Sequence, residues 1–175
     1  MQQMTSEVEH VILVDEQDQE IGVMEKMQAH REGRLHRAFS IFIFNSDGQM
    51  MLHKRAANKY HSPGLWSNAC CSHPRPGEDV LQAANRRLQE EMGFTCRLSP
   101  AFKFSYRASL DQGMTENEFD HVLTGRYTGS PVLNPDEVAE WKWMDTGLLY
   151  EDLQLNPDHY TYWFKAAFPV WLRLM

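Results

Sequence analysis

The sequence has little cysteine, no long apolar run and no excess of positive charge. Its three cysteines are Cys70, Cys71 and Cys96, and because the first two are neighbours that cannot easily bridge each other, a disulfide framework is disfavoured. No apolar run approaches the roughly 20 residues that span a bilayer, and the polar, acidic residues 1–10 contain no apolar signal region. These absences predict a cytoplasmic protein whose reducing surroundings keep the thiols free.

The formal net charge of −7 argues against a nucleic-acid or anionic-membrane surface, because such partners need clustered positive charge on the protein. An anionic small molecule would have to meet a local group of basic side chains. The length of 175 residues with 42% hydrophobic content favours one globular domain over residues 1–175. We expect a monomer or a weak dimer.

Residues 37–44 (RAFSIFIF) have the strongest strand pattern. They are nearly continuous in apolar residues and too short for a helix, which predicts a strand buried on both faces. Residues 45–48 would then turn the chain so that 49–55 returns as the partner strand. Further strand patterns lie at 10–14 and 21–23, which form a hairpin, and at 101–108, 115–127 and 138–144.

Residues 78–92 have the clearest helix pattern. Leu81, Ala84, Leu88 and Met92 fall on one face, and Gly93 is a typical C-terminal stop. Helical segments are also predicted within 24–34, 145–153 and 159–172. Between them, residues 56–77 form a long irregular segment, and a long loop inside a compact domain is usually functional.

That segment contains WSNACCSHP, residues 66–74, in which a thiol lies two residues from an imidazole. Beside His73 and basic side chains, Cys71 could have a lowered pKa and act as a base, acid or nucleophile. Cys70 and Cys96 are better interpreted as small buried apolar residues. No acyl-transfer triad is visible, so a cysteine protease is disfavoured.

Histidines and glutamates from three separated segments form a candidate metal site. Each lies at the end of a predicted strand or loop, where side chains from several elements could converge; they are His30, His36, His73, Glu116 and Glu118. Glu116 and Glu118 would share one face of their strand. Imidazole with carboxylate suits zinc, manganese or iron rather than calcium, although solvated or core histidines would give the same spacing.

Basic and aromatic residues suggest what this site binds. Arg87 and Glu91 could clamp a diphosphate and hold a hard cation, and the alternative is a set of salt bridges on a solvated helix face. Lys26, Arg55 and Lys59 would extend the basic pocket. Aromatic side chains, including Tyr106 and Trp163, are either core residues or a face that stabilises a carbocation.

Several motifs, in order, resemble those of the type 1 isopentenyl-diphosphate delta-isomerases of the Nudix superfamily: RLHRAFS, KRA, WSNACCSHP, RRLQEEMGF, YRA, ENE and TYWF. The resemblance covers residues 8–168. It implies the Nudix fold, an α/β (α+β) arrangement in which helices sandwich a mixed central sheet, with extra N-terminal strands. It also implies interconversion of isopentenyl diphosphate and dimethylallyl diphosphate, in isoprenoid precursor biosynthesis, by proton addition and removal through a tertiary carbocation.

The resemblance assigns roles residue by residue. It implies that Cys71 and Glu118 are the opposed catalytic pair. Tyr106 would position the Glu118 carboxylate and help it deliver the proton, and Trp163 would lie against the reacting carbons. One Mn²⁺ or Zn²⁺ (or Mg²⁺) would be held by His30, His36, His73, Glu116 and Glu118. A Mg²⁺ would bind Glu91 together with the diphosphate, which Lys26, Arg55, Lys59 and Arg87 surround. No flavin is expected.

Three positions depart from the expected patterns. Against the hydrolase signature of the superfamily, Ser72 replaces the first glycine and Arg87 replaces the second glutamate, and loss of that carboxylate favours diphosphate binding without cleavage. Near the C-terminus, Tyr162 stands where a proline is expected before Trp163. The alternatives are a Nudix hydrolase of a nucleoside or prenyl diphosphate and a non-catalytic diphosphate-binding Nudix module, which would share the fold.

Overall fold

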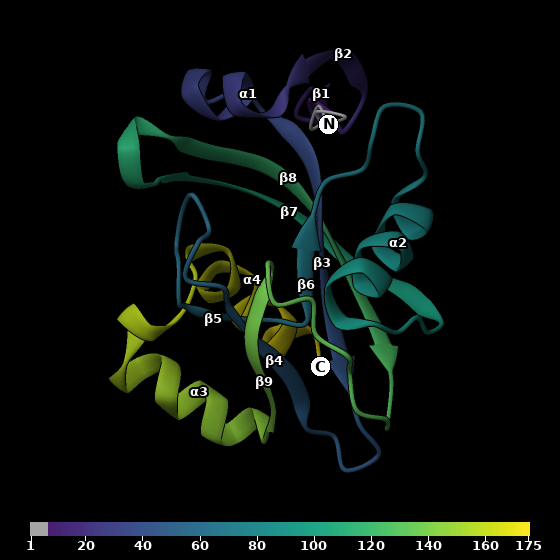
Figure 1. The fold of residues 1–175 in the computed structure, drawn as a ribbon, viewed down its shortest axis with the longest axis vertical. Helices are drawn as coiled ribbons and strands as arrows, with labels where there is room; N and C mark the ends of the chain where they lie inside the picture. Colours follow the sequence, from purple (N-terminus) through teal and green to yellow (C-terminus); the bar gives the residue numbers. More distant parts are fainter. Residues whose placement is uncertain (1–6) are drawn as a thin grey trace, which may run out of the picture.

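The computed structural model describes residues 7–175, so the predictions for residues 1–6 lie outside it. Within the described residues, helices cover both faces of a mixed nine-stranded sheet (Figure 1). This confirms the predicted α+β class, and the extra N-terminal strands are present. No helix in residues 7–175 combines the length and apolar character that a bilayer crossing requires.

The N-terminal part forms a hairpin followed by a short helix. Strands β1 (His10–Val14) and β2 (Glu20–Glu25) pair antiparallel, as predicted. Helix α1 (Lys26–Glu32) begins at the Glu25 carboxylate, which accepts hydrogen bonds from two backbone N–H groups. It ends at Gly33, whose φ of +65° suits glycine. The short α1 therefore delivers His30 directly beside the start of the central strand.

Strand β3 (His36–Phe44) is central and is buried on both faces, as predicted. It pairs antiparallel with β6 (Cys70–Ser72) and parallel with β8 (Thr115–Arg126), and β8 pairs antiparallel with β7 (Leu98–Ser109). Between β7 and β8 lies the 3-10 helix η1 (Asp111–Gly113). Side chains from β3, β6, β7 and β8 can thus meet across one part of the sheet.

The predicted β3–β4 hairpin is wrong in its pairing. The turn forms, with the Gly48 N–H bonded to the Asn45 carbonyl, but β4 (Met50–Arg55) meets β3 only where Met50 faces Phe44. Because β6 and β8 pair with β3, β4 pairs instead with β9 (Val138–Met144) and β5 (Trp66–Ser67). The segment 56–77 therefore contains two short strands.

Two helices close the faces of the sheet (Figure 1). Helix α2 (Val80–Met92), capped by Asp79 and ended by Gly93, packs its apolar face on one side, against Phe39 and Ile41 of β3. Helix α4 (Tyr162–Leu174) packs on the other side with α3 (Thr146–Leu155), against Phe42. The 3-10 helix η2 (Pro157–His159) connects α3 to α4. Alternate residues of β3 thus serve two separate cores.

Candidate active site

The neighbouring thiols on β6 point to opposite faces of the sheet. Cys70 is fully buried in the core under α2, whereas Cys71 is half-buried and packs on the α4 side. This follows from the alternation of side chains along a strand. Residues 70–72 pair with β3 so that Ser40 faces Cys71. Only Cys71 therefore lies on the side where the candidate catalytic groups gather.

Four of the predicted metal ligands converge from four elements. Ligand atoms of His30 on α1, His36 on β3, His73 after β6 and Glu118 on β8 lie within 4.8 Å of one another. The Nε2 atom of His36 is 3.3 Å from Nε2 of His73, and Glu118 Oε1 lies 2.9 Å from His73 Nε2 and 3.4 Å from His36 Nε2. Parallel pairing of β3 with β8 aligns His36 with Glu118.

The ring orientations fit a bound cation. Nδ1 of His30 lies 2.7 Å from the Lys26 carbonyl and Nδ1 of His36 lies 2.8 Å from the Arg34 carbonyl, so each Nδ1 carries the proton and each Nε2 presents a lone pair. Among the described residues, the buried Nε2 of His30 has no hydrogen-bond partner. Burial also lowers the pKa of His30, and lowers that of His73 to about 4, which favours neutral ligands.

Glu116 lies beside this cluster and is joined to it through Tyr106. The Tyr106 hydroxyl is 2.6 Å from Glu118 Oε2 and 3.1 Å from Glu116 Oε2, and all three side chains are buried. Burial and the charge of Glu118 hold the pKa of Glu116 well above its ordinary value. Burial alone would raise the pKa of Glu118, but His36 and His73 hold it well below. These pKa shifts therefore favour a protonated Glu116 beside an ionised Glu118.

The Cys71 thiol has polar neighbours but, among residues 7–175, no basic one within hydrogen-bond distance. Its sulfur lies 3.1 Å from Asn68 Oδ1 and 3.4 Å from Ser40 Oγ. Burial, with the nearby Asp120 carboxyl, raises the pKa of Cys71, which corrects the expectation of a lowered value. The local sequence suggested basic neighbours, but His73, two residues along, turns to Glu118 instead.

The candidate residues line two adjoining cavities. A small one, of about 60 Å³, brings together the predicted catalytic, basic and acidic side chains: Lys26, Arg55, Lys59, Cys71, His73, Arg87, Glu91, Tyr106, Glu116, Glu118 and Trp163. A larger one, of about 370 Å³, shares Lys26, Lys59 and Arg87 with it. These cations therefore stand where the two cavities meet, between the reactive groups and the wider space.

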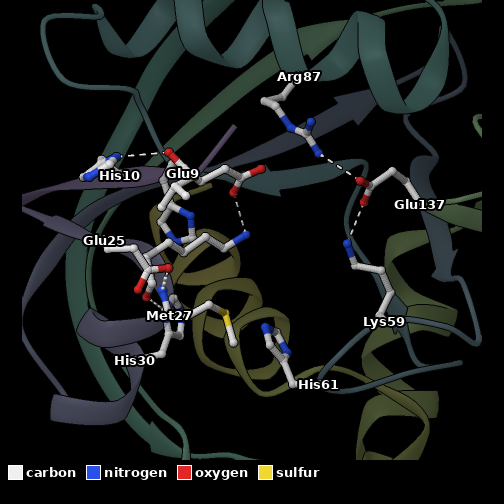
Figure 2. A network of polar contacts seen from close by, with 12 residues as sticks. Glu9, His10, Glu25, Met27, His30, Lys59, His61, Arg87 and Glu137 are labelled. Carbon is white, nitrogen blue, oxygen red and sulfur yellow. Dashed lines mark hydrogen bonds and ion pairs between the residues drawn. The ribbon is translucent and has the colours of Figure 1, made fainter. Parts of the chain in front are cut away.

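Carboxylates neutralise most of these cations. Glu137 lies between Arg87 and Lys59, 3.6 Å and 2.6 Å away (Figure 2). Glu9 is 2.9 Å from Lys26. Arg55 instead stacks over the Trp163 ring at 5.0 Å. Within the described chain, the buried Nε atoms of Arg55 and Arg87 have no hydrogen-bond partner. Free donors on two guanidinium groups in one cavity suit a diphosphate.

The two arginines of α2 have different carboxylate partners. Arg86 pairs with Glu78, just before the helix, at 2.8 Å; both side chains are partly buried, and Arg86 lines the larger cavity. Arg87 instead bonds the buried Glu91 at 2.6 Å, and the Cys70 thiol donates to the other oxygen of Glu91 at 3.2 Å. Glu91 is thus held at the cavity with its oxygens directed by two neighbours, as a ligand for Mg²⁺ needs.

His61 is a site residue that the sequence reasoning missed. It is 4% exposed, its ring lies 5.6 Å from Trp163 in an edge-to-face contact, and its Nε2 is 3.8 Å from Glu116. Burial, and the charge of Arg55, lower its pKa to about 3. The signal for it in the sequence is its position in the long irregular segment 56–77, for which a functional role is expected.

Known proteins resemble this chain in sequence and in fold. The family model for the NUDIX domain matches residues 34–164. "Isopentenyl-diphosphate Delta-isomerase 1" of Aromatoleum aromaticum is 59% identical, over 91% of this chain and 90% of its own length, and the enzyme of Pectobacterium atrosepticum is 50% identical over 90% and 88%. The solved structure of DR0079 from Deinococcus radiodurans, 20% identical, has a TM-score of 0.77 over 92% of this chain and 98% of its own.

Proposed function

The chain belongs to the type 1 isopentenyl-diphosphate delta-isomerases of the Nudix superfamily, and we propose that Cys71 and Glu118 are its two proton-transfer groups. The enzyme interconverts isopentenyl diphosphate and dimethylallyl diphosphate. The residue assignment depends on the shared cavity. It is lined by a thiol, a carboxylate, an indole and four cations. A diphosphate hydrolase has no need of the thiol and the indole.

The reaction needs two groups that act at different carbons. Addition of a proton to the terminal methylene carbon, C4, of isopentenyl diphosphate gives a tertiary cation at C3, and loss of a proton from C2 gives dimethylallyl diphosphate. We assign delivery at C4 to Glu118, assisted by the Tyr106 hydroxyl, and removal at C2 to Cys71. The Trp163 ring offers its π-face to the cation, and the buried walls keep out water that would trap it.

The directions of the two pKa shifts favour one end of this cycle. A thiol with a raised pKa and a Glu118 with a lowered pKa are the states that remain after a forward turnover. They are also the states that start the reverse reaction, in which Cys71 protonates C2 of dimethylallyl diphosphate. Before the next forward turnover Glu118 must regain a proton and Cys71 must lose one to solvent. Glu116, with its raised pKa, is next to Tyr106 and can pass its proton to the Glu118 side, after which it takes up a proton from solvent.

Two cation sites are part of the proposal. Nε2 atoms of His30, His36 and His73, with Glu118 and the adjacent Glu116, would hold one Mn²⁺, Zn²⁺ or Mg²⁺. Glu91 would hold Mg²⁺ together with the substrate diphosphate. Cations at these sites would neutralise part of the diphosphate charge and orient the carboxylates. Lys26, Arg55, Lys59 and Arg87 bind the remaining diphosphate charge.

The remaining assignments concern the whole chain. We propose that residues 1–175 act as one unit, as a monomer or weak dimer, in the cytoplasm. Three free thiols support a reducing compartment.

The experiment that tests the proposal uses purified protein with Mg²⁺ and isopentenyl diphosphate in deuterated water. We expect dimethylallyl diphosphate with deuterium in a methyl group and no phosphate release, and no product with Cys71→Ala. Phosphate release without an isomer would overturn the assignment and support a hydrolase instead.

A further inference from the structure

One chain of hydrogen bonds joins the Trp163 indole to the Cys71 thiol. The indole Nε1 of Trp163 donates to Ser67 Oγ at 2.9 Å, and the Ser67 hydroxyl donates to Asn68 Oδ1 at 3.0 Å. The Cys71 sulfur lies 3.1 Å from the same Asn68 oxygen. Ser67, Asn68 and Trp163 are each at most 3% exposed, so water does not compete for these bonds.

The direction of each bond in the chain is fixed. An indole N–H can only donate, so Ser67 accepts from Trp163 and has its own proton left for Asn68. The Asn68 amide nitrogen donates to the carbonyls of Ile41 at 3.1 Å and Cys70 at 2.9 Å, so its oxygen faces Ser67 and Cys71 as an acceptor. None of these hydrogen-bonded side chains can reverse its orientation without leaving a buried polar group unpaired.

The backbone ties the same two regions together. The Thr161 N–H donates to the Trp66 carbonyl at 2.9 Å, and Trp66 forms an isolated parallel bridge with Tyr160. The start of α4 is therefore fixed to β5, immediately before the residues that lead into β6. Thr161 Oγ1 adds a bond of 3.1 Å to Ser67 Oγ, but it takes no part in the link between the indole and the thiol.

From this arrangement we infer that Ser67 and Asn68 are positioning residues for the isomerisation. They set the distance and angle between the Trp163 ring and the Cys71 sulfur, which come from distant parts of the chain. This inference rests on the proposed function, because it takes Trp163 and Cys71 as the groups that face the reacting carbons. Small errors in the placement of such groups reduce the rate strongly while binding persists.

The test is Ser67→Ala, with Thr161→Val as the matched control. We expect Ser67→Ala to lower kcat about tenfold or more with KM changed less than about twofold, because the diphosphate-binding cations are untouched. Thr161→Val removes a buried bond to the same hydroxyl and should change kcat less than about twofold. Rates are normalised to the folded fraction measured by circular dichroism.

A double-mutant cycle separates positioning from general stability. In a Trp163→Phe background, Ser67→Ala should lower kcat further by less than about twofold, because the chain of hydrogen bonds from Trp163 to Cys71 is already interrupted. If Ser67→Ala does not fold, Trp163 can be replaced with benzothienylalanine, which keeps a bicyclic aromatic face and has sulfur in place of the donating N–H. This variant should lower kcat in the same way. The inference is refuted if the benzothienylalanine variant or Ser67→Ala keeps full kcat. It is also refuted if Ser67→Ala lowers kcat equally in the wild-type and Trp163→Phe backgrounds. Wild-type protein that forms no isomer would instead refute the proposed function.

Discussion

Replacement of Asp120 with asparagine should make the stability of the protein less dependent on pH. Asp120 lies on β8 and is 1% exposed; its Oδ2 accepts a bond of 2.7 Å from the Ser40 hydroxyl, whereas its buried Oδ1 has no hydrogen-bond partner among the described residues. Burial, with the charge of Glu118, raises the pKa of the Asp120 carboxyl from 3.8 to about 8. The folded protein thus retains a proton that the unfolded chain releases in the acidic range.

The sign of the effect follows from proton linkage. Because the folded-state pKa is the higher one, the stabilisation is fully present below pH 3.8 and is lost as the pH rises through about 8. Between pH 5 and pH 9 the loss is at most about 4 kcal/mol, because it grows by about 1.4 kcal/mol for each pH unit from 5 to about 8 and then stops. Relaxation around a buried charge reduces this to roughly 2–4 kcal/mol.

Urea unfolding at pH 5 and pH 9, with a chelator present, measures the difference. At pH 5 the variant should be less stable than the wild type by about 1–3 kcal/mol, because its amide nitrogen lacks an acceptor. From pH 5 to pH 9 the difference should move by roughly 2–4 kcal/mol in favour of Asp120→Asn. Asp136→Asn, at an exposed loop position, is the control for loss of one carboxyl group. A difference that stays constant within about 0.5 kcal/mol would refute the reasoning.

Three further predictions concern the site. Cys71→Ala should abolish turnover and leave the thermal unfolding midpoint nearly unchanged, whereas Cys70→Ala, which removes one hydrogen bond worth about 1 kcal/mol, should retain most activity; equal losses would show that the wrong thiol was assigned. His30→Ala should lose bound divalent cation on dialysis, measured by elemental analysis, whereas the exposed His10→Ala should retain it. Glu137→Gln should lower KM for isopentenyl diphosphate about two- to fivefold in steady-state assays, because two cations of the pocket lose a competing carboxylate. An unchanged or higher KM would contradict this last prediction.

The elements of the fold were largely predictable because their signals are local. The apolar run of β3 and the helical spacing in α2, with Gly93 at its end, are patterns within a dozen or so residues. Strand pairing was less predictable. The turn at residues 45–48 does form, but β6 and β8 come from far along the chain and take the edges of β3 that the hairpin would have used.

The site was predictable where an element imposes a fixed spacing. Alternation along β8 places Glu116 and Glu118 on one face, and the register with β3 brings Glu118 to His36. The environment of Cys71 was not predictable, because its neighbours Ser40 and Asp120 come from β3 and β8 and no local pattern connects them. His61 was missed for the same reason, since its neighbours include Trp163 of α4, Glu116 of β8 and His30 of α1.

The three-residue length of β6 makes the register of one short strand decisive for the chemistry. A slip of one residue against β3 would exchange the faces of the two thiols and bring Cys70 to the cavity in place of Cys71. A thiol would still be present there. His73, however, would move with the slip and leave His36 and Glu118 without their third partner. An insertion or deletion of one residue near β6 would therefore keep a thiol at the cavity but remove His73 from the metal site, so one cysteine cannot replace the other after a change of register.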